Sequence, residues 1–169
     1  MSNADLLQFR KEKDDFFKHA DESPVPPNKR SGFGGLVYFE PNDDLVFEVT
    51  LEETEPTDIT IHTTTGEERT YVRTAKATIV VGGEDATVAL YSTGHEGLFL
   101  PFKDATSGTE TYGAGRYVDV LPNGDGTAMI DFNYSYAPFC AYNDQYSCAL
   151  PPAENWLSVA IRAGERNTA

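Results

Sequence analysis

A change in hydrophobic period divides this chain and constrains its fold more than any other feature. From Asp5 to Ala20, apolar residues recur at helical spacing and charged residues, Arg10 among them, occupy the remaining faces. This pattern predicts one amphipathic helix over residues 5–20, with Leu6, Phe9, Phe16 and Phe17 as its apolar side. The Ser23–Pro27 run ends the helix, because proline lacks an amide hydrogen and disfavours helix in the residue before it.

Beyond residue 34 the period becomes two, and short β-branched and aromatic segments alternate with turn-forming residues. Turn signals about every ten residues are typical of an antiparallel meander. We therefore expect a mainly β protein, a single antiparallel β-sandwich or barrel-like domain whose N-terminal helix covers an open edge or end. No βαβ alternation occurs, which disfavours a parallel sheet. The predicted strands are 36–39, 45–51, 58–63, 69–73, 77–81, 86–91, 98–102, 116–120, 128–132 and 157–162.

These segments form one expected domain over residues 1–169, in which no repeat or linker marks a boundary. A β-strand meander spans 34–132, an aromatic and proline-rich loop spans 133–156, and a final strand spans 157–163. A loop of this length inside a compact domain is usually functional. The sequence thus directs attention to residues 133–156.

The charge balance excludes some classes of partner. The 169 residues carry 13 Lys and Arg against 27 Asp and Glu, a formal charge of −14. Such a chain repels phosphate backbones and anionic lipids, so we expect neither nucleic-acid nor membrane binding. The acidity is dispersed and resembles the solvated surface of halophilic proteins.

Two cysteines and three histidines limit metal and redox chemistry. No signal peptide and no transmembrane segment is recognisable, so the expected location is cytoplasmic, where a structural disulfide between Cys140 and Cys148 is disfavoured. Seven residues separate these cysteines, a wider spacing than a zinc knuckle has. Reduced thiols, a redox-labile pair and a zinc site of Cys140, Cys148 and His95 with Asp131 or Glu154 all remain open. No cofactor is predicted.

Six motifs in the second half of the chain form a recognisable set: Leu98–Asp104, Thr106–Tyr117, Asp131–Asn133, Pro138–Tyr142, Cys148–Asn155 and Ile161–Glu165. Together they resemble the bacterial and archaeal family catalogued as domain of unknown function 1684. The resemblance implies a cytoplasmic, stand-alone domain for which no activity is established. One departure is Ala149, where the family motif leads us to expect proline.

Polar and aromatic residues gather in the loops 104–117 and 133–156, which predicts a pocket for a small polar or anionic ligand. Arg116 would hold the anion, and Asp131 and Glu154 are the candidate catalytic residues. An alternative role is structural, with Arg116–Asp131 and Arg162–Glu154 as partly buried ion pairs. The candidate ligand-binding residues are Tyr112, Arg116, Asp131, Asn133, Tyr136, Cys140, Glu154, Asn155 and Arg162.

Two other function classes stay open. The aromatic loop, with Tyr136 and Tyr142, is also suited to a homodimer interface, and a metal-dependent enzyme is the third class. Gly108–Gly115 is not a phosphate loop, because it lacks the lysine followed by Ser or Thr. No Gly-x-Ser-x-Gly nucleophile motif occurs. The sequence therefore does not decide whether this protein is an enzyme.

Overall fold

The computed structural model describes residues 3–92 and 97–167 and begins with helix α1, Asn3–His19. The predicted helix is confirmed, with its first residue two positions earlier than expected. Ser23 ends it locally, since its hydroxyl donates to the Phe17 carbonyl and accepts from the Val25 N–H at 3.1 Å. A 3₁₀ turn, η1, follows at Pro27–Gly32.

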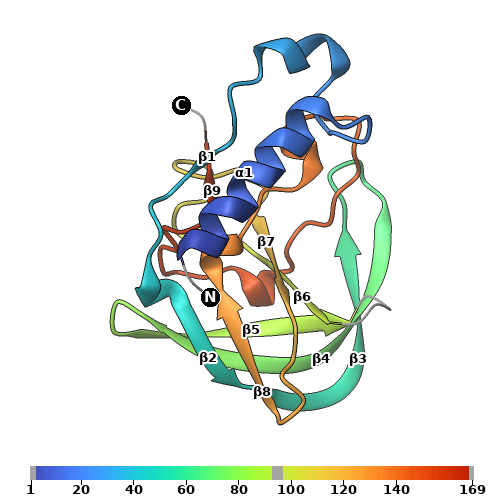
Figure 1. Ribbon diagram of the computed structural model, residues 1–169. Helices are drawn as coiled ribbons and strands as arrows, with labels where there is room; N and C mark the ends of the chain where they lie inside the picture. The colour runs from blue at the N-terminus through green and yellow to red at the C-terminus, as the bar shows by residue number, and fades with distance from the viewer. Residues whose placement is uncertain (1–2, 93–96, 168–169) are drawn as a thin grey trace.

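The strands form one five-stranded sheet and two small pairs, all antiparallel (Figure 1). The larger sheet runs in sequence order: β3 (Glu52–His62), β4 (Glu68–Val81), β5 (Glu84–Ser92), β6 (Leu98–Phe102) and β7 (Arg116–Val120). Strand β2 (Val46–Thr50) pairs with β8 (Thr127–Asp131), and β1 (Val37–Tyr38) pairs with β9 (Glu165–Arg166). The predicted mainly β, antiparallel fold is confirmed as a sandwich-like arrangement, and the sheets do not close into a barrel.

Strand β4 joins two segments that the sequence divides. The stretches 69–73 and 77–81, predicted as separate strands, are one strand of 14 residues. Its pairing with β5 shifts register between Arg73 and Ala75, and β3 shifts against β4 between Glu53 and Thr57. Such irregularities bend a strand without ending it, which is why β3 and β4 continue through residues that look like turns.

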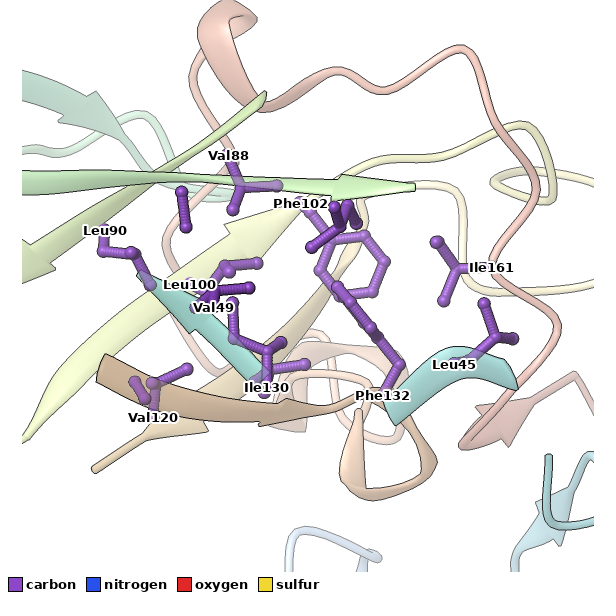
Figure 2. Close-up of a cluster of buried hydrophobic side chains, with 14 of the residues drawn as sticks. Leu45, Val49, Val88, Leu90, Leu100, Phe102, Val120, Ile130, Phe132 and Ile161 are labelled. Atoms are coloured by element: carbon purple, nitrogen blue, oxygen red, sulfur yellow. The ribbon is translucent and has the colours of Figure 1, made fainter. Parts of the chain in front are cut away.

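The main core lies between the β2–β8 pair and the larger sheet (Figure 2). Strand β2 and the 3₁₀ turn η2 (Asp43–Leu45) supply Val49 and Leu45, which lie with Val88, Leu90 and Leu100 in one buried cluster. The Phe102 and Phe132 rings meet edge-on at 5.3 Å between centroids. Each large apolar side chain buried in this way contributes about 1.5–3 kcal/mol.

The predicted final strand at 157–163 is wrong, because this segment joins no sheet. Its Val159, Ile161 and Ala163 are buried in alternation, as in a strand. The backbones of Lys103 and Ala105 bond Leu157 and Val159, whereas side chains take the hydrogen bonds of Ile161 and Ala163, as described below. The strand that does form is the two-residue β9, further along the chain.

Helix α1 lies at one end of the strand assembly, beside β1 and β9 (Figure 1). Its buried residues are Leu6, Arg10 and Phe17, whereas Phe9 and Phe16 are partly exposed, so the expected placement of Arg10 on an outer face is wrong. Phe17 packs edge-on against Tyr142 of the aromatic loop, at 5.1 Å between centroids. In the described part of the chain no helix is long and apolar enough to cross a membrane.

Candidate functional site

Arg116 opens strand β7 and is fully buried, with 1% of its surface exposed. Its Nη1 donates to the carbonyls of Ala163 at 2.6 Å and Glu165 at 3.1 Å, and its Nη2 donates to that of Ile161 at 2.7 Å. Asp104 lies 3.6 Å from Nη2, and the Asp104 carboxylate also accepts from the Ile161 N–H at 2.7 Å. Both terminal nitrogens of the predicted anion holder are therefore engaged by the protein's own chain.

Asp131 and Asn133 hold a turn together. The Asp131 carboxylate accepts from the backbone N–H and the side-chain amide of Asn133, both at 2.9 Å, and so caps the 3₁₀ turn η3, Phe132–Tyr134. Asn133 then bonds the backbone of Asn42 in both directions, at 2.9 and 3.0 Å. The expected pair Arg116–Asp131 is wrong, since Arg116 pairs with Asp104.

The next three candidates, Glu154, Asn155 and Arg162, have different partners. Glu154 pairs with Arg73 at 2.7 Å and accepts from the Tyr91 hydroxyl, whereas Arg162 pairs with Glu110 at 3.0 Å. The expected pair Arg162–Glu154 is therefore wrong. Asn155, in the 3₁₀ turn η5 (Ala153–Asn155), is fully buried and bonds the backbones of β5 and β6 through Ala89 and Pro101.

The remaining candidates lie closer together. The Tyr112 hydroxyl is 3.4 Å from Cys140 Sγ, and Cys140 belongs to the 3₁₀ turn η4, Phe139–Ala141. The Tyr136 hydroxyl donates to Asp119 at 3.0 Å, and the Lys13 ammonium lies 4.7 Å from the centre of the Tyr136 ring. The two predicted loops thus do meet, through Tyr112 and Cys140.

A small cavity of about 140 Å³ opens where these loops meet β9, and we call it the loop cavity. Tyr112 comes from the first loop, Tyr142 from the second, and Glu165 and Arg166 from β9. Hydroxyl, carboxylate, guanidinium and amide groups therefore face one space, which is the usual lining of a specific polar site. The lining residues are Tyr112, Ala137, Ala141, Tyr142, Glu165, Arg166 and Asn167.

Glu165 is the charged residue at the bottom of the loop cavity, with only 2% of its surface exposed. Its carboxylate pairs with Lys13 of α1, accepts from the Tyr142 hydroxyl, and accepts from the Ala137 N–H at 3.4 Å. A buried carboxylate is tolerated when a cation and hydrogen-bond donors surround it. This arrangement fixes Glu165 while leaving it able to accept a further hydrogen bond.

Both cavity tyrosines remain hydrogen-bond donors at neutral pH. Burial is the main cause that raises the pKa of Tyr142, and the neighbouring Glu165 charge raises it further. Burial also raises the pKa of Tyr112, with a second contribution from the bond to Cys140. The phenols therefore stay neutral, and the charges lining or bordering the cavity are those of Lys13, Glu165 and Arg166.

Sequence reasoning missed Glu165, Lys13 and Arg166 as site residues. Glu165 follows Val159, Ile161 and Ala163 at the same parity, so the buried alternation carries its side chain inward. Lys13 lies at helical spacing from Leu6, Arg10 and Phe17, the buried face of α1. In both cases the signal is a charged residue at a position where the spacing of the buried residues continues.

An open groove adjoins the loop cavity and shares Arg166 with it. The β1 groove has a volume of about 420 Å³ and includes Glu40, Asn42, Arg162 and Arg166. The Arg166 guanidinium lies over the Phe39 ring, 4.6 Å from its centre. Within residues 3–92 and 97–167, no carboxylate lies within ion-pair distance of Arg166.

The predicted zinc ligands are only partly described. Cys140 and Cys148 are free cysteines, the first buried and the second half-buried, and His95 lies outside the described residues. Among the residues that the structure describes, no group of three or more His, Cys, Asp or Glu side chains is arranged to hold a metal ion.

The aromatic rings expected at a homodimer interface pack largely within their own chain. Phe139 lies edge-on to Phe17 at 5.9 Å, and Tyr136 lies edge-on to Tyr117 at 5.7 Å between ring centroids. The loop surface left for a second copy is therefore smaller than the sequence indicates, and dimerisation stays a prediction.

Comparisons with known proteins give a family and a structural relative. The family model described as "Protein of unknown function (DUF1684)" matches residues 31–166. The uncharacterized protein from gene locus rrnAC0354 of Haloarcula marismortui, solved by solution NMR, is 37% identical with a TM-score of 0.74. That match covers 98% of this chain and 94% of the other. No curated protein matches.

Proposed function

Because the chain belongs to the DUF1684 family, whose description gives no activity, we propose a function from its geometry: it binds a small polar molecule with an anionic group in the loop cavity. One observation carries this proposal. Tyr112, Tyr142, the buried Glu165 and Arg166 line one space between the two loops, and no carboxylate of the described residues lies within ion-pair distance of Arg166. Ligand sites recur where a few polar groups converge on a concave surface.

Each polar group has a distinct part in this proposal. Arg166 offers a planar fork to a carboxylate or phosphate, which it holds better than a point charge does. Tyr112 donates a hydrogen bond to a ligand oxygen, and Glu165 accepts one from a ligand hydroxyl or ammonium group. Lys13 and Tyr142 hold the Glu165 side chain in place, so the acceptor is oriented before the ligand arrives.

The volume restricts the size of the ligand. A cavity of about 140 Å³ is smaller than the roughly 300–1,000 Å³ of typical small-molecule pockets, so it holds a few non-hydrogen atoms. A longer ligand would extend past Arg166 into the β1 groove, which that arginine also lines. Short hydroxy acids, amino acids and phosphate monoesters fit this description.

Thermal unfolding with a panel of organic acids, amino acids and phosphate monoesters tests the proposal. At least one compound should raise the melting temperature of the parent protein, because a ligand that binds only the folded state stabilises it. Arg166→Gln and Tyr112→Phe should each remove most of that shift. The matched control Lys76→Gln removes a positive charge from β4 and should keep it.

Two results would contradict the proposal. One is that no compound of the panel stabilises the parent protein. The other is that the stabilising compound acts equally on the parent, Arg166→Gln and Tyr112→Phe proteins, which would place its binding elsewhere.

A further inference from the structure

A further groove, of about 480 Å³, borders the main core between β3, β4 and the β7–β8 turn, and we call it the bulge groove. It shares no described lining residue with the loop cavity or the β1 groove. Its volume falls within the roughly 300–1,000 Å³ of typical small-molecule pockets. The bulge groove is therefore large enough to take a small ligand of its own.

The irregular pairing of β4 accounts for the shape of this groove. The two register shifts of β4, one against β3 and one against β5, both fall at Thr74. Bulges bend a strand and re-aim its side chains, and they are frequent beside binding sites. Thr74 lines the groove together with Thr54 and Pro56, which come from the bulged part of β3. One wall of the groove is thus built from residues that have left the regular ladder.

The floor of the bulge groove is apolar and continuous with the main core. Ala75 belongs to that core, and Leu51 and Leu98 pack against it. The opposite wall is the β7–β8 turn, which contributes Pro122 and Gly126. The Leu51 N–H donates to the Gly126 carbonyl at 2.8 Å and so holds this turn beside the start of β3 (Figure 1). An apolar group that enters the groove therefore leaves water for side chains that already pack on the core.

The charge at this groove is negative. Glu53 lines it and stands opposite Ala75 in the β3–β4 register, so both side chains lie on the core face of the sheet. Lys76, the register partner of Glu52, lies on the other face for the same reason. Within residues 3–92 and 97–167, no basic residue lines the groove and no cation lies within ion-pair distance of Glu53. Glu53 is therefore available to a cation from outside the protein, which the formal charge of −14 attracts.

A second polar group of the wall also lacks a partner. The Thr54 hydroxyl is buried, and no hydrogen-bonding group of the described residues contacts it. Such a hydroxyl gains a partner if its side chain rotates towards a donor in the groove. An ammonium group carries three donors, enough to bond a carboxylate and a hydroxyl together.

We propose that the bulge groove binds a small organic cation, a primary ammonium group on a short apolar chain. The apolar chain lies on the floor of Leu51, Ala75 and Leu98, and the ammonium group pairs with the Glu53 carboxylate. An anion of the same length would be repelled by that carboxylate. This site takes a ligand of opposite charge to that of the loop cavity, so failure of either proposal leaves the other standing.

A ¹H–¹⁵N NMR titration of the parent protein with hexylammonium chloride tests the proposal. Sodium chloride at about 0.15 M limits the diffuse attraction of cations to the acidic surface, because it screens charges beyond about 8 Å. Saturable shifts should concentrate at the backbone amides of Leu51, Thr54, Thr74, Gly124 and Gly126. From propylammonium to hexylammonium, each added methylene should lower the dissociation constant about two- to fourfold, since it removes apolar surface from water. Sodium hexanoate should give no saturable shifts at these amides.

Two variants separate the contact with Glu53 from an effect of net charge. Glu53→Gln keeps the shape of the side chain and should weaken hexylammonium binding about threefold. The matched control Glu48→Gln removes a charge from an exposed position on β2 and should leave the dissociation constant unchanged. The proposal is overturned if hexanoate binds the groove as well as hexylammonium does, if chain length has no effect, or if the shifts spread over the surface without saturating. Equal weakening in the two variants would overturn it too.

Discussion

Arg116 and Asp104 form a fully buried ion pair, 3.6 Å apart, that takes the place of a strand beside residues 161–165. Arg116 donates to three carbonyls of this segment, and Asp104 accepts the N–H of Ile161. Buried extended backbone needs a partner for each polar group, and these two side chains supply several of the partners. The backbones of Phe39 and Ser135 bond Gly164 and Glu165. Glu165, at the end of this segment, is thereby positioned in the loop cavity.

Replacing Arg116 by methionine should lower the free energy of unfolding by about 3–5 kcal/mol, because it leaves the Asp104 charge buried without its partner. Urea denaturation followed by circular dichroism measures this loss. Arg162→Met is the matched control, since Arg162 is exposed and its ion pair with Glu110 contributes little to stability. Equal losses in the two variants would show that Arg116 does not support the segment.

Gly164→Ala should be more destabilising than Gly124→Ala. Both glycines have positive φ, +81° and +90°, so an alanine is strained at either position by about 1–2 kcal/mol. Only at Gly164 would the added Cβ also meet other atoms, the Phe132 carbonyl oxygen at 2.8 Å and the Ser135 side chain, whereas Gly124 has open space. Thermal unfolding of both variants checks this ranking, and a Gly164→Ala protein as stable as Gly124→Ala would contradict it.

Glu110 should titrate below its ordinary pKa of 4.5, chiefly because Arg162 donates hydrogen bonds to its carboxylate. Since the folded pKa is lower than the unfolded one, the stabilisation is present above pH about 4.5 and is lost as the pH falls through the lowered value. Its size is small because the pair is exposed. An NMR titration should show the Glu110 pKa rising towards 4.5 in Arg162→Gln and staying low in Lys76→Gln. An unchanged Glu110 pKa in Arg162→Gln would contradict this assignment.

Salt should stabilise this protein. The formal charge is −14, and adjacent acidic residues repel one another at turns and strand ends, as at Glu84 and Asp85, the first two residues of β5. Raising potassium chloride from about 0.1 to 1 M shortens the screening length from about 10 to 3 Å. The melting temperature should rise by several degrees, and the double variant Glu84→Gln, Asp85→Asn should show a smaller rise. A melting temperature that falls with salt would contradict this reading of the acidity.

The period of the apolar residues was sufficient to predict most of the fold. The sequence identified β5, β6 and β7 within a residue or two at each end, because each is a short run rich in apolar and β-branched or aromatic residues between turn-forming residues. The same rule failed at 157–163, where the burial alternates as in a strand. The hydrogen bonds of this segment go to the backbones of Lys103 and Ala105 and to the side chains of Asp104, Arg116 and Ser135. Burial produces a periodic pattern of apolar residues in the sequence, whereas the identity of a hydrogen-bonding partner produces no such pattern.

The sequence predicted which two loops meet, but not the ion pairs around them. The loops 104–117 and 133–156 do meet, but the expected pairs Arg116–Asp131 and Arg162–Glu154 are wrong. Which charged residues form an ion pair depends on their distance in the fold, which the sequence does not give. Lys13 and Glu165, which form an ion pair beside the loop cavity, are 152 positions apart. If every charged residue is assumed to face solvent, such a pair is missed, because only the fold brings its two members together.

The most direct test of the loop cavity as a ligand site is a two-dimensional ¹H–¹⁵N NMR titration with the compound that gives the largest thermal stabilisation. The account predicts saturable shifts concentrated at the backbone amides of Tyr112, Ala141, Tyr142 and Asn167, and predicts that Arg166→Gln abolishes them. Shifts centred on another surface, or shifts of the same size in Arg166→Gln, would contradict it.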